Sequence, residues 1–183
     1  MKNSILLTVS LAALALGGCG KKEDSVSEPT FEASDTMATA SQAPIASPAQ
    51  TFANAAAASD MFEIEASKLA TTNAALAKIK TFADNMIKAH TESTAKLKAA
   101  AAAASITPMA QITPAQQQVL DDLKAKSGSE FDAAYARAQV DAHQMTLDTL
   151  KGYAANGEAP SLKAFAAELT PIVTAHLNMA KAL

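Results

Sequence analysis

The chain has 183 residues, a formal net charge of −3, a single cysteine and no tryptophan. This weakly acidic balance gives no electrostatic support for nucleic-acid binding, and one cysteine excludes both an internal disulfide framework and a cysteine-cluster metal site. The composition is rich in alanine and contains 6 glycines, which favours helices over strands because alanine loses no side-chain entropy in a helix.

The first nineteen residues have the layout of a secretory signal. Lys2 precedes an apolar run over residues 5–16, which is shorter than the roughly 20 residues that a membrane-spanning helix needs. The run ends in Leu-Gly-Gly-Cys, which resembles the bacterial lipoprotein box. That resemblance implies removal of residues 1–18, lipidation of Cys19, and a lipid anchor as the membrane partner. Gly20 follows the cysteine, which favours the outer membrane with the protein facing the periplasm.

The segment after the cysteine predicts a tether. Residues 19–50 are rich in Ser, Ala, Pro and Thr, and their apolar residues are isolated. Such a segment buries too little apolar area to offset the entropy of ordering it. We therefore expect a flexible tether over 19–50 and a folded domain over 51–183.

The domain is predicted to be all-α, because apolar residues recur at spacings of three and four. Four long helices and one short helix are expected, at residues 51–70, 76–104, 114–126 (the short one), 131–155 and 161–182. The long connection between the second and third long helices favours a ferritin-like four-helix bundle, whose crossover contains the short helix. A plain up-down-up-down bundle is the alternative.

Each of the three histidines lies on the apolar stripe of a different long helix. At 1.5 Å per residue, the crossover topology places His90, His143 and His176 at similar heights, with Glu63 on the first helix near them. Three imidazoles and a carboxylate could bind a divalent metal ion. The alternative is that each histidine is a core residue hydrogen-bonded to a neighbour, which is the commoner situation.

Dinuclear iron chemistry has little support. Di-iron bundles carry Glu three residues before a ligand histidine on two helices, whereas Ile87, Val140 and Val173 occupy those positions here. The sequence also contains no nucleophile-elbow motif and no glycine-rich phosphate loop. We therefore expect a protein that is not an enzyme.

Several segments in order resemble one bacterial family, the "predicted outer membrane protein" family with domain of unknown function 4142, which is grouped with ferritin-like folds. The segments are FEIEASKLA at 62–70, FADNMIKAH at 82–90, FDAAY at 131–135, HQ at 143–144, and LKAFA at 162–166 followed by Pro171 and His176. The family's characteristic positions correspond to Glu63, His90, Tyr135, His143 and His176.

The chain departs from that family at two positions. The family commonly has Asp directly before the histidines of the second and third long helices, where this chain has Ala89 and Ala142. The resemblance supports fold and location more than function. The first functional hypothesis is therefore an envelope lipoprotein with a non-catalytic domain that needs no cofactor and binds an unidentified protein or small ligand. The second is a metal-binding or stress-related ferritin-like protein.

Overall fold

The computed structural model describes residues 46–183, and within them the chain is all-helical. The predicted signal peptide (1–18), Cys19 and most of the predicted tether (19–50) lie outside the described residues. The five helices are α1 (Pro48–Asn73), α2 (Ala77–Ala103), α3 (Pro114–Lys124), α4 (Gly128–Asn156) and α5 (Pro160–Ala180).

The first helix begins three residues before the predicted domain boundary. The Ser47 side chain accepts a hydrogen bond from the Gln50 backbone N–H, and Pro48 occupies the first helical position. A proline fits there because its missing N–H would have no intrahelical partner. Ala49 is already buried. Residues 48–50 therefore belong to the folded domain rather than to the tether.

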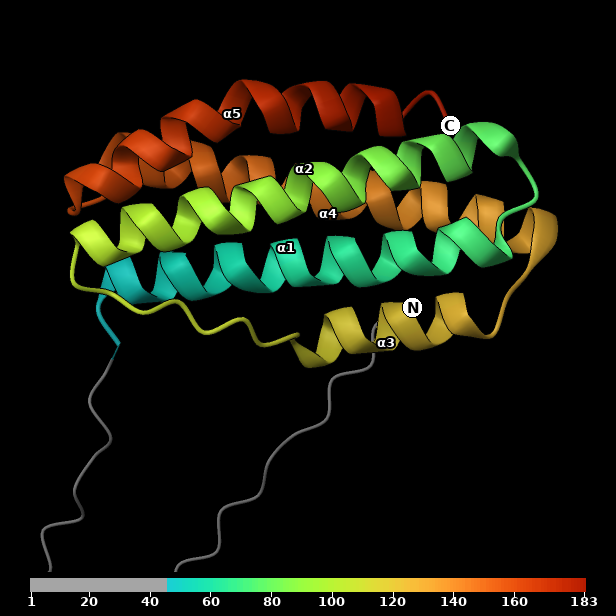
Figure 1. Cartoon of the computed structure of the whole chain (residues 1–183), viewed down its shortest axis with the longest axis horizontal. Coiled ribbons are helices and arrows are strands. Elements are labelled where there is room, and N and C mark those ends of the chain that lie inside the picture. The colour runs from blue at the N-terminus through green and yellow to red at the C-terminus, as the bar shows by residue number, and fades with distance from the viewer. Residues whose placement is uncertain (1–45) are drawn as a thin grey trace, which may run out of the picture. The chain divides into compact units, whose positions relative to one another are not determined.

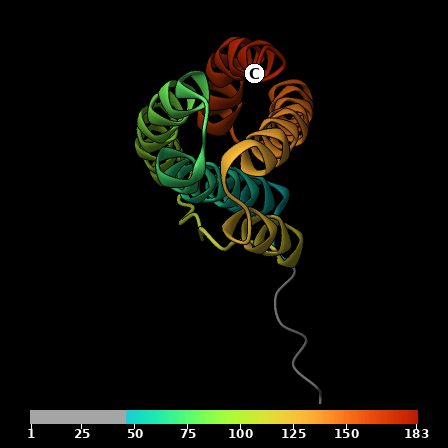
Figure 2. The same cartoon turned by 90° about the vertical axis from the view of Figure 1, so that its right-hand side faces the viewer.

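The four long helices form two antiparallel hairpins, α1–α2 and α4–α5 (Figure 1). Residues 104–113 and α3 run back along the outside of α1, so the turns of the two hairpins lie at opposite ends of the domain (Figure 1). Viewed from one end, α1 packs on α4 and α2 packs on α5, while α3 lies outside against α1 (Figure 2). The result is a helical bundle with one long connection.

The buried interior consists of two apolar clusters with a polar layer between them. One cluster centres on the aromatic rings of Phe52, Tyr153 and Phe165, and the other contains Phe82 and Tyr135. His90 on α2 and His143 on α4 each fall between residues of the two clusters along their helix. These two histidines therefore lie at the level where the two apolar halves of the bundle meet.

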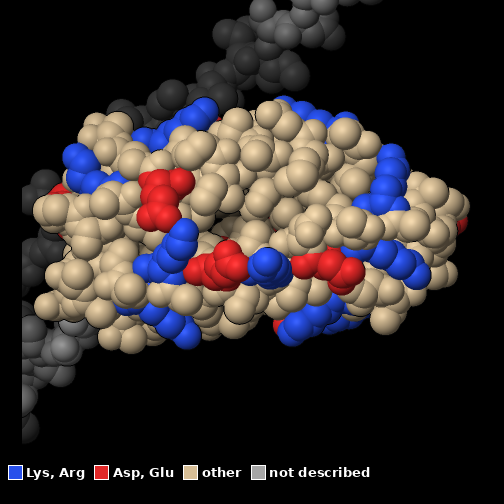
Figure 3. Space-filling model, turned by 45° about the horizontal axis from the view of Figure 1, so that its top comes forward, with Lys and Arg blue, Asp and Glu red and all other residues tan. Residues whose placement is uncertain are grey.

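The described surface carries charges of both signs. On the face shown in Figure 3, basic and acidic residues alternate. One ion pair of the described surface joins Lys96 on α2 to Glu168 on α5, with the charged atoms 2.6 Å apart. Among residues 46–183, no helix is both long enough and apolar enough to cross a membrane.

Candidate metal centre

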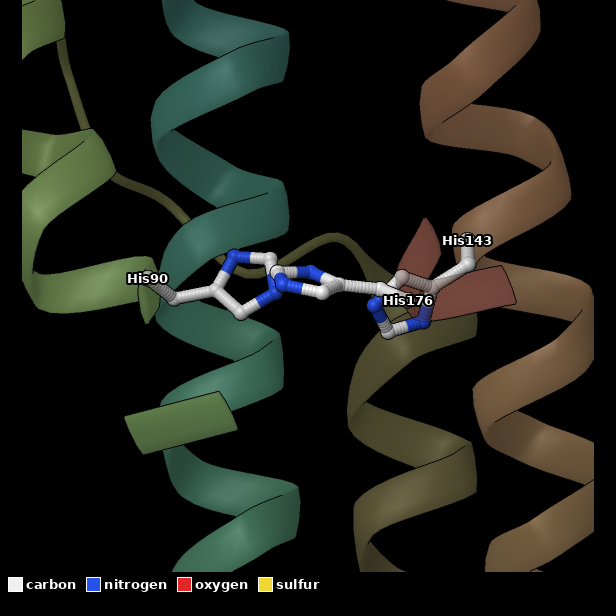
Figure 4. Close-up of side chains that lie close together, drawn as sticks. All are labelled: His90, His143 and His176. Atoms are coloured by element: carbon white, nitrogen blue, oxygen red, sulfur yellow. The ribbon is translucent and has the colours of Figure 1, made fainter. Parts of the chain in front are cut away.

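Three helices direct their histidines to one point inside the bundle. His90 comes from α2, His143 from α4 and His176 from α5, and their rings point toward one another (Figure 4). The ring centroids are 5.6–5.8 Å apart. One ring nitrogen from each histidine lies within 4.8 Å of the corresponding nitrogens of the other two. Residues separated by 86 positions in the chain therefore form one cluster of imidazoles.

His90 is oriented by a carboxylate on the neighbouring helix. Its Nδ1 lies 2.8 Å from Oδ1 of Asp60 on α1, and the other oxygen of Asp60 accepts a hydrogen bond from the Thr94 hydroxyl. The Nε2 of His90 is buried and has no hydrogen-bond partner among the described residues. A proton held on Nδ1 by Asp60 leaves the lone pair of Nε2 directed at the cluster.

The other two histidines each present a free nitrogen as well. The Nδ1 of His143 donates to the backbone carbonyl of Gln139 at 2.8 Å, one helical turn earlier. Neither Nε2 of His143 nor Nδ1 of His176 has a hydrogen-bond partner within residues 46–183, although both atoms are buried. Each ring thus brings an unpaired nitrogen to the same polar layer.

Burial keeps two of these imidazoles neutral. Burial, and after it the positive charge of His90, lowers the pKa of His143 to about 3 and that of His176 to about 4. Burial also acts to lower the pKa of His90, but the hydrogen bond with Asp60 and the charges of Glu63 and Asp60 outweigh it, so this pKa is raised. At neutral pH, His143 and His176 therefore offer lone pairs without first losing a proton.

The structure places Glu63 beside the cluster but not within it. Its Oε1 lies 3.5 Å from Nδ1 of His143, the ring nitrogen that is already bound to Gln139. The Glu63 side chain is 1% exposed, and neither carboxylate oxygen has a hydrogen-bond partner among the described residues. Burial raises the pKa of Glu63 to about 7, against an opposing attraction to His90. Of the four proposed metal ligands, the three histidines converge and Glu63 lies behind one of them.

Two buried residues of the site were missed in the sequence analysis. Asp60 is three residues before Glu63, which puts both carboxylates on one face of α1. Gln139 is four residues before His143, on the same face of α4, and is fully buried. Helical spacing from the two predicted ligands would have found both. Tyr135, a further turn along α4, hydrogen-bonds to Ser67, and burial raises its pKa above the usual range.

Comparison with known proteins assigns the chain to a family. A family model described as "Domain of unknown function (DUF4142)" matches residues 34–183. The match includes all five helices and therefore every residue of the histidine cluster. No curated protein and no solved structure gives a significant match to the chain.

Proposed function

The chain belongs to the family of the domain of unknown function DUF4142, and from that premise we propose that its helical domain binds one divalent transition-metal ion through His90, His143 and His176. The observation that carries the proposal is the convergence of three histidine rings in one buried layer, each of which has a buried nitrogen without a hydrogen-bond partner among the described residues. Imidazole is a common ligand of zinc, copper, iron and nickel.

The competing interpretation, three ordinary core histidines, leaves these nitrogens unexplained. A buried polar atom without a partner costs about 1–3 kcal/mol, and native proteins contain few of them. Here three such atoms belong to three rings whose centroids are only 5.6–5.8 Å apart. A bound ion would pair with all three at once, which favours a metal site over three unrelated core histidines.

The arrangement favours a mononuclear centre. Dinuclear bundles bridge two ions with several carboxylates, whereas Asp60 is bound to His90 and Thr94, and Glu63 faces Nδ1 of His143. Two ligands of a tetrahedral zinc ion lie about 3.3 Å apart. Because the ring nitrogens that come together in the cluster are up to 4.8 Å apart, we expect binding to draw the three rings closer together.

The rest of the chain supports an envelope lipoprotein. We propose that residues 1–18 are a signal peptide, that Cys19 carries the lipid, and that the residues up to α1 tether the domain on the periplasmic side of the outer membrane. The helix order, with a long connection between two antiparallel hairpins, is consistent with a ferritin-like four-helix bundle. The domain acts in this proposal as a binding module rather than as an enzyme.

The proposal predicts that Zn²⁺ raises the melting temperature of the chelator-treated protein. A ligand at a hundredfold excess over its dissociation constant stabilises the folded state by about 2.7 kcal/mol. The variants His90→Ala, His143→Ala and His176→Ala should each lose this rise, because each removes one of three ligands. Differential scanning calorimetry with and without Zn²⁺ measures it.

Met86→Ala is the matched control. Met86 is fully buried on α2, one turn before His90, so its truncation should lower the melting temperature while the Zn²⁺-dependent rise remains. If the wild-type protein showed no rise, or if the histidine variants kept it, the three histidines would be core residues and the metal proposal would be wrong.

A further inference from the structure

We infer that the histidine centre keeps one coordination position open for a small exogenous ligand, and that a cavity beside His90 and His176 holds this ligand. The inference rests on the proposed metal site and specifies what that site does. It follows from the number of protein donors, from the space beside two of the three histidines, and from the chemistry of the cavity wall.

The described residues supply three donors to the cluster and no fourth. Structural zinc sites are closed by four protein ligands, whereas sites that exchange a ligand have three protein ligands and an open position. The two nearby carboxylates are directed elsewhere: Asp60 to His90 Nδ1 and Thr94, and Glu63 to His143 Nδ1. A four-coordinate ion held by the three histidines would therefore take its fourth ligand from outside the protein.

Space for that ligand exists next to two of the three rings. A cavity of about 30 Å³ is lined by His90, His176 and Asp60, together with residues of α1, α4 and α5. The unpaired ring nitrogens of His90 and His176 are buried, and their rings form part of this wall. A cavity of this size holds one or two water molecules, provided that polar partners are present.

The wall also restricts what can bind. Apart from the two histidines and Asp60, it includes the hydroxyl side chains of Ser93 and Thr146, and apolar or small side chains such as those of Leu169, Val173 and Ala56. A ligand of two or three non-hydrogen atoms fits the volume, and a bulky or strongly hydrated one does not. The inferred class of ligand is a water or hydroxide that can be replaced by a small anion or diatomic molecule.

A second cavity gives a control for the experiment. It has a volume of about 280 Å³, lies between α1, α3 and α4, and shares Ala56, Thr146 and Leu150 with the small one. Ala55 lines the larger cavity but not the smaller. Enlarging Ala56 therefore reduces the space beside the histidines, and the same change at Ala55 does not.

The test uses the full chain loaded with Co²⁺, whose visible absorption bands depend on coordination number and donor atoms, and azide as the exogenous ligand. Azide should shift the Co²⁺ bands of the wild-type protein without removing the ion, as elemental analysis would verify. In Ala56→Val, Co²⁺ should bind as before and the azide affinity should fall about tenfold or more. Ala55→Val should behave like the wild type.

Each other outcome has a defined meaning. Co²⁺ binding with bands that azide does not change would overturn the open position and leave the metal site intact. An equal azide response in Ala56→Val would also overturn the inference, because the ligand would then bind elsewhere. Absence of Co²⁺ binding would refute the metal site itself. If Ala56→Val does not fold, Ala89→Val changes the same cavity from α2 and answers the question.

Discussion

At the scale of single residues, the polar groups around the histidines have different roles. Asp60 and the Gln139 carbonyl hold Nδ1 of His90 and His143, which fixes the tautomer and the direction of each free Nε2. Glu63 holds neither ring by a hydrogen bond of ordinary length. The site therefore has groups that orient the histidines as well as the histidine ligands themselves. Mutation of an orienting group tests its effect on metal affinity without removing a ligand.

Asp60→Asn should weaken Zn²⁺ binding about 10- to 100-fold, because an amide no longer increases the electron density of the His90 ring as a carboxylate does. Isothermal titration calorimetry gives the affinity directly. Glu65→Gln makes the same change at an exposed carboxylate on α1, one that pairs with Lys68, and should leave the affinity unchanged. Equal affinities for Asp60→Asn and the wild type would mean that Asp60 has only a structural role.

Glu63→Gln should change how the stability of the metal-free protein depends on pH. The raised pKa of Glu63, about 7 against an ordinary 4.5, means that the folded state binds its proton more tightly than the unfolded state. Glu63 thus favours folding below pH 4.5, and this contribution is lost as pH rises through 7. The stability of Glu63→Gln relative to wild type should rise between pH 4.5 and 7, by up to roughly 3 kcal/mol.

Urea denaturation in the presence of a chelator, repeated across that pH range, measures the difference. Glu65→Gln again serves as the control, because it makes the same change at an exposed carboxylate on α1. A flat difference for Glu63→Gln would show that Glu63 ionises in the fold as it does in water.

The three histidines could be predicted from the sequence because each one interrupts an apolar stripe. The convergence of their free nitrogens could not, since it depends on the rotation of each helix about its axis. A rotation of one residue, 100° in an α-helix, would direct His176 away from the interior. Glu63 illustrates the limit: its height on α1 was predicted near the cluster, but not which nitrogen of His143 it would face.

At the scale of helices, the start of α2 depends on a residue far away in the chain. The sequence predicts that the first long helix ends at residue 70, but α1 continues to Asn73. The position before α2 is Leu76, which makes no side-chain cap. The carboxylate of Asp132 on α4 instead accepts hydrogen bonds from the backbone N–H groups of Ala75 and Leu76, both at 3.0 Å.

Asp132→Ala should lower the free energy of unfolding by about 1–3 kcal/mol, because it removes the acceptor of two backbone donors at a helix start. Chemical denaturation measures the loss. The Zn²⁺-dependent rise in melting temperature should persist, since Asp132 does not line the histidine cluster. A change below about 0.5 kcal/mol would mean that water replaces this cap.

The positions of the helices in the chain could be predicted well from local patterns. Which face of each helix is exposed could be predicted less well. Met145 continues the apolar spacing of Phe131, Tyr135, Ala138 and Ala142, yet it is 70% exposed. The reason is tertiary: Ala138, Ala142 and Met145 line the larger cavity between α1, α3 and α4. No local pattern shows that the connecting helix α3 packs loosely enough to leave such a space.

At the scale of the whole molecule, the inferred anchor and the folded domain are separate in the chain. The long connection, the all-α class and the opposite hairpin turns follow from the lengths of the apolar stripes, and the structure has them. The anchor depends on a short motif at Cys19, which is outside the described residues. The anchor is therefore tested by locating the protein in cells rather than by the structure of the domain.

Cys19→Ser should release the protein from the membrane fraction, because the apolar run over 5–16 is too short to span the bilayer and lipidation requires the thiol. Fractionation of cells in high salt, with immunodetection in the soluble and membrane fractions, measures the release. Ser25→Ala, a hydroxyl change in the predicted tether, is the control and should stay with the membrane. Retention of Cys19→Ser in washed membranes would refute the lipid anchor.

The division of ligands between the two hairpins has a consequence for how the fold is held together. His90 belongs to α1–α2, while His143 and His176 belong to α4–α5. An ion bound by all three would act as a cross-link between two halves that the chain itself joins only through residues 104–127. Because the ion binds only where the three imidazoles are held together, its binding free energy would stabilise the folded arrangement of the two hairpins. In a protein whose one cysteine is predicted to carry a lipid, coordination would supply the staple that a second thiol cannot.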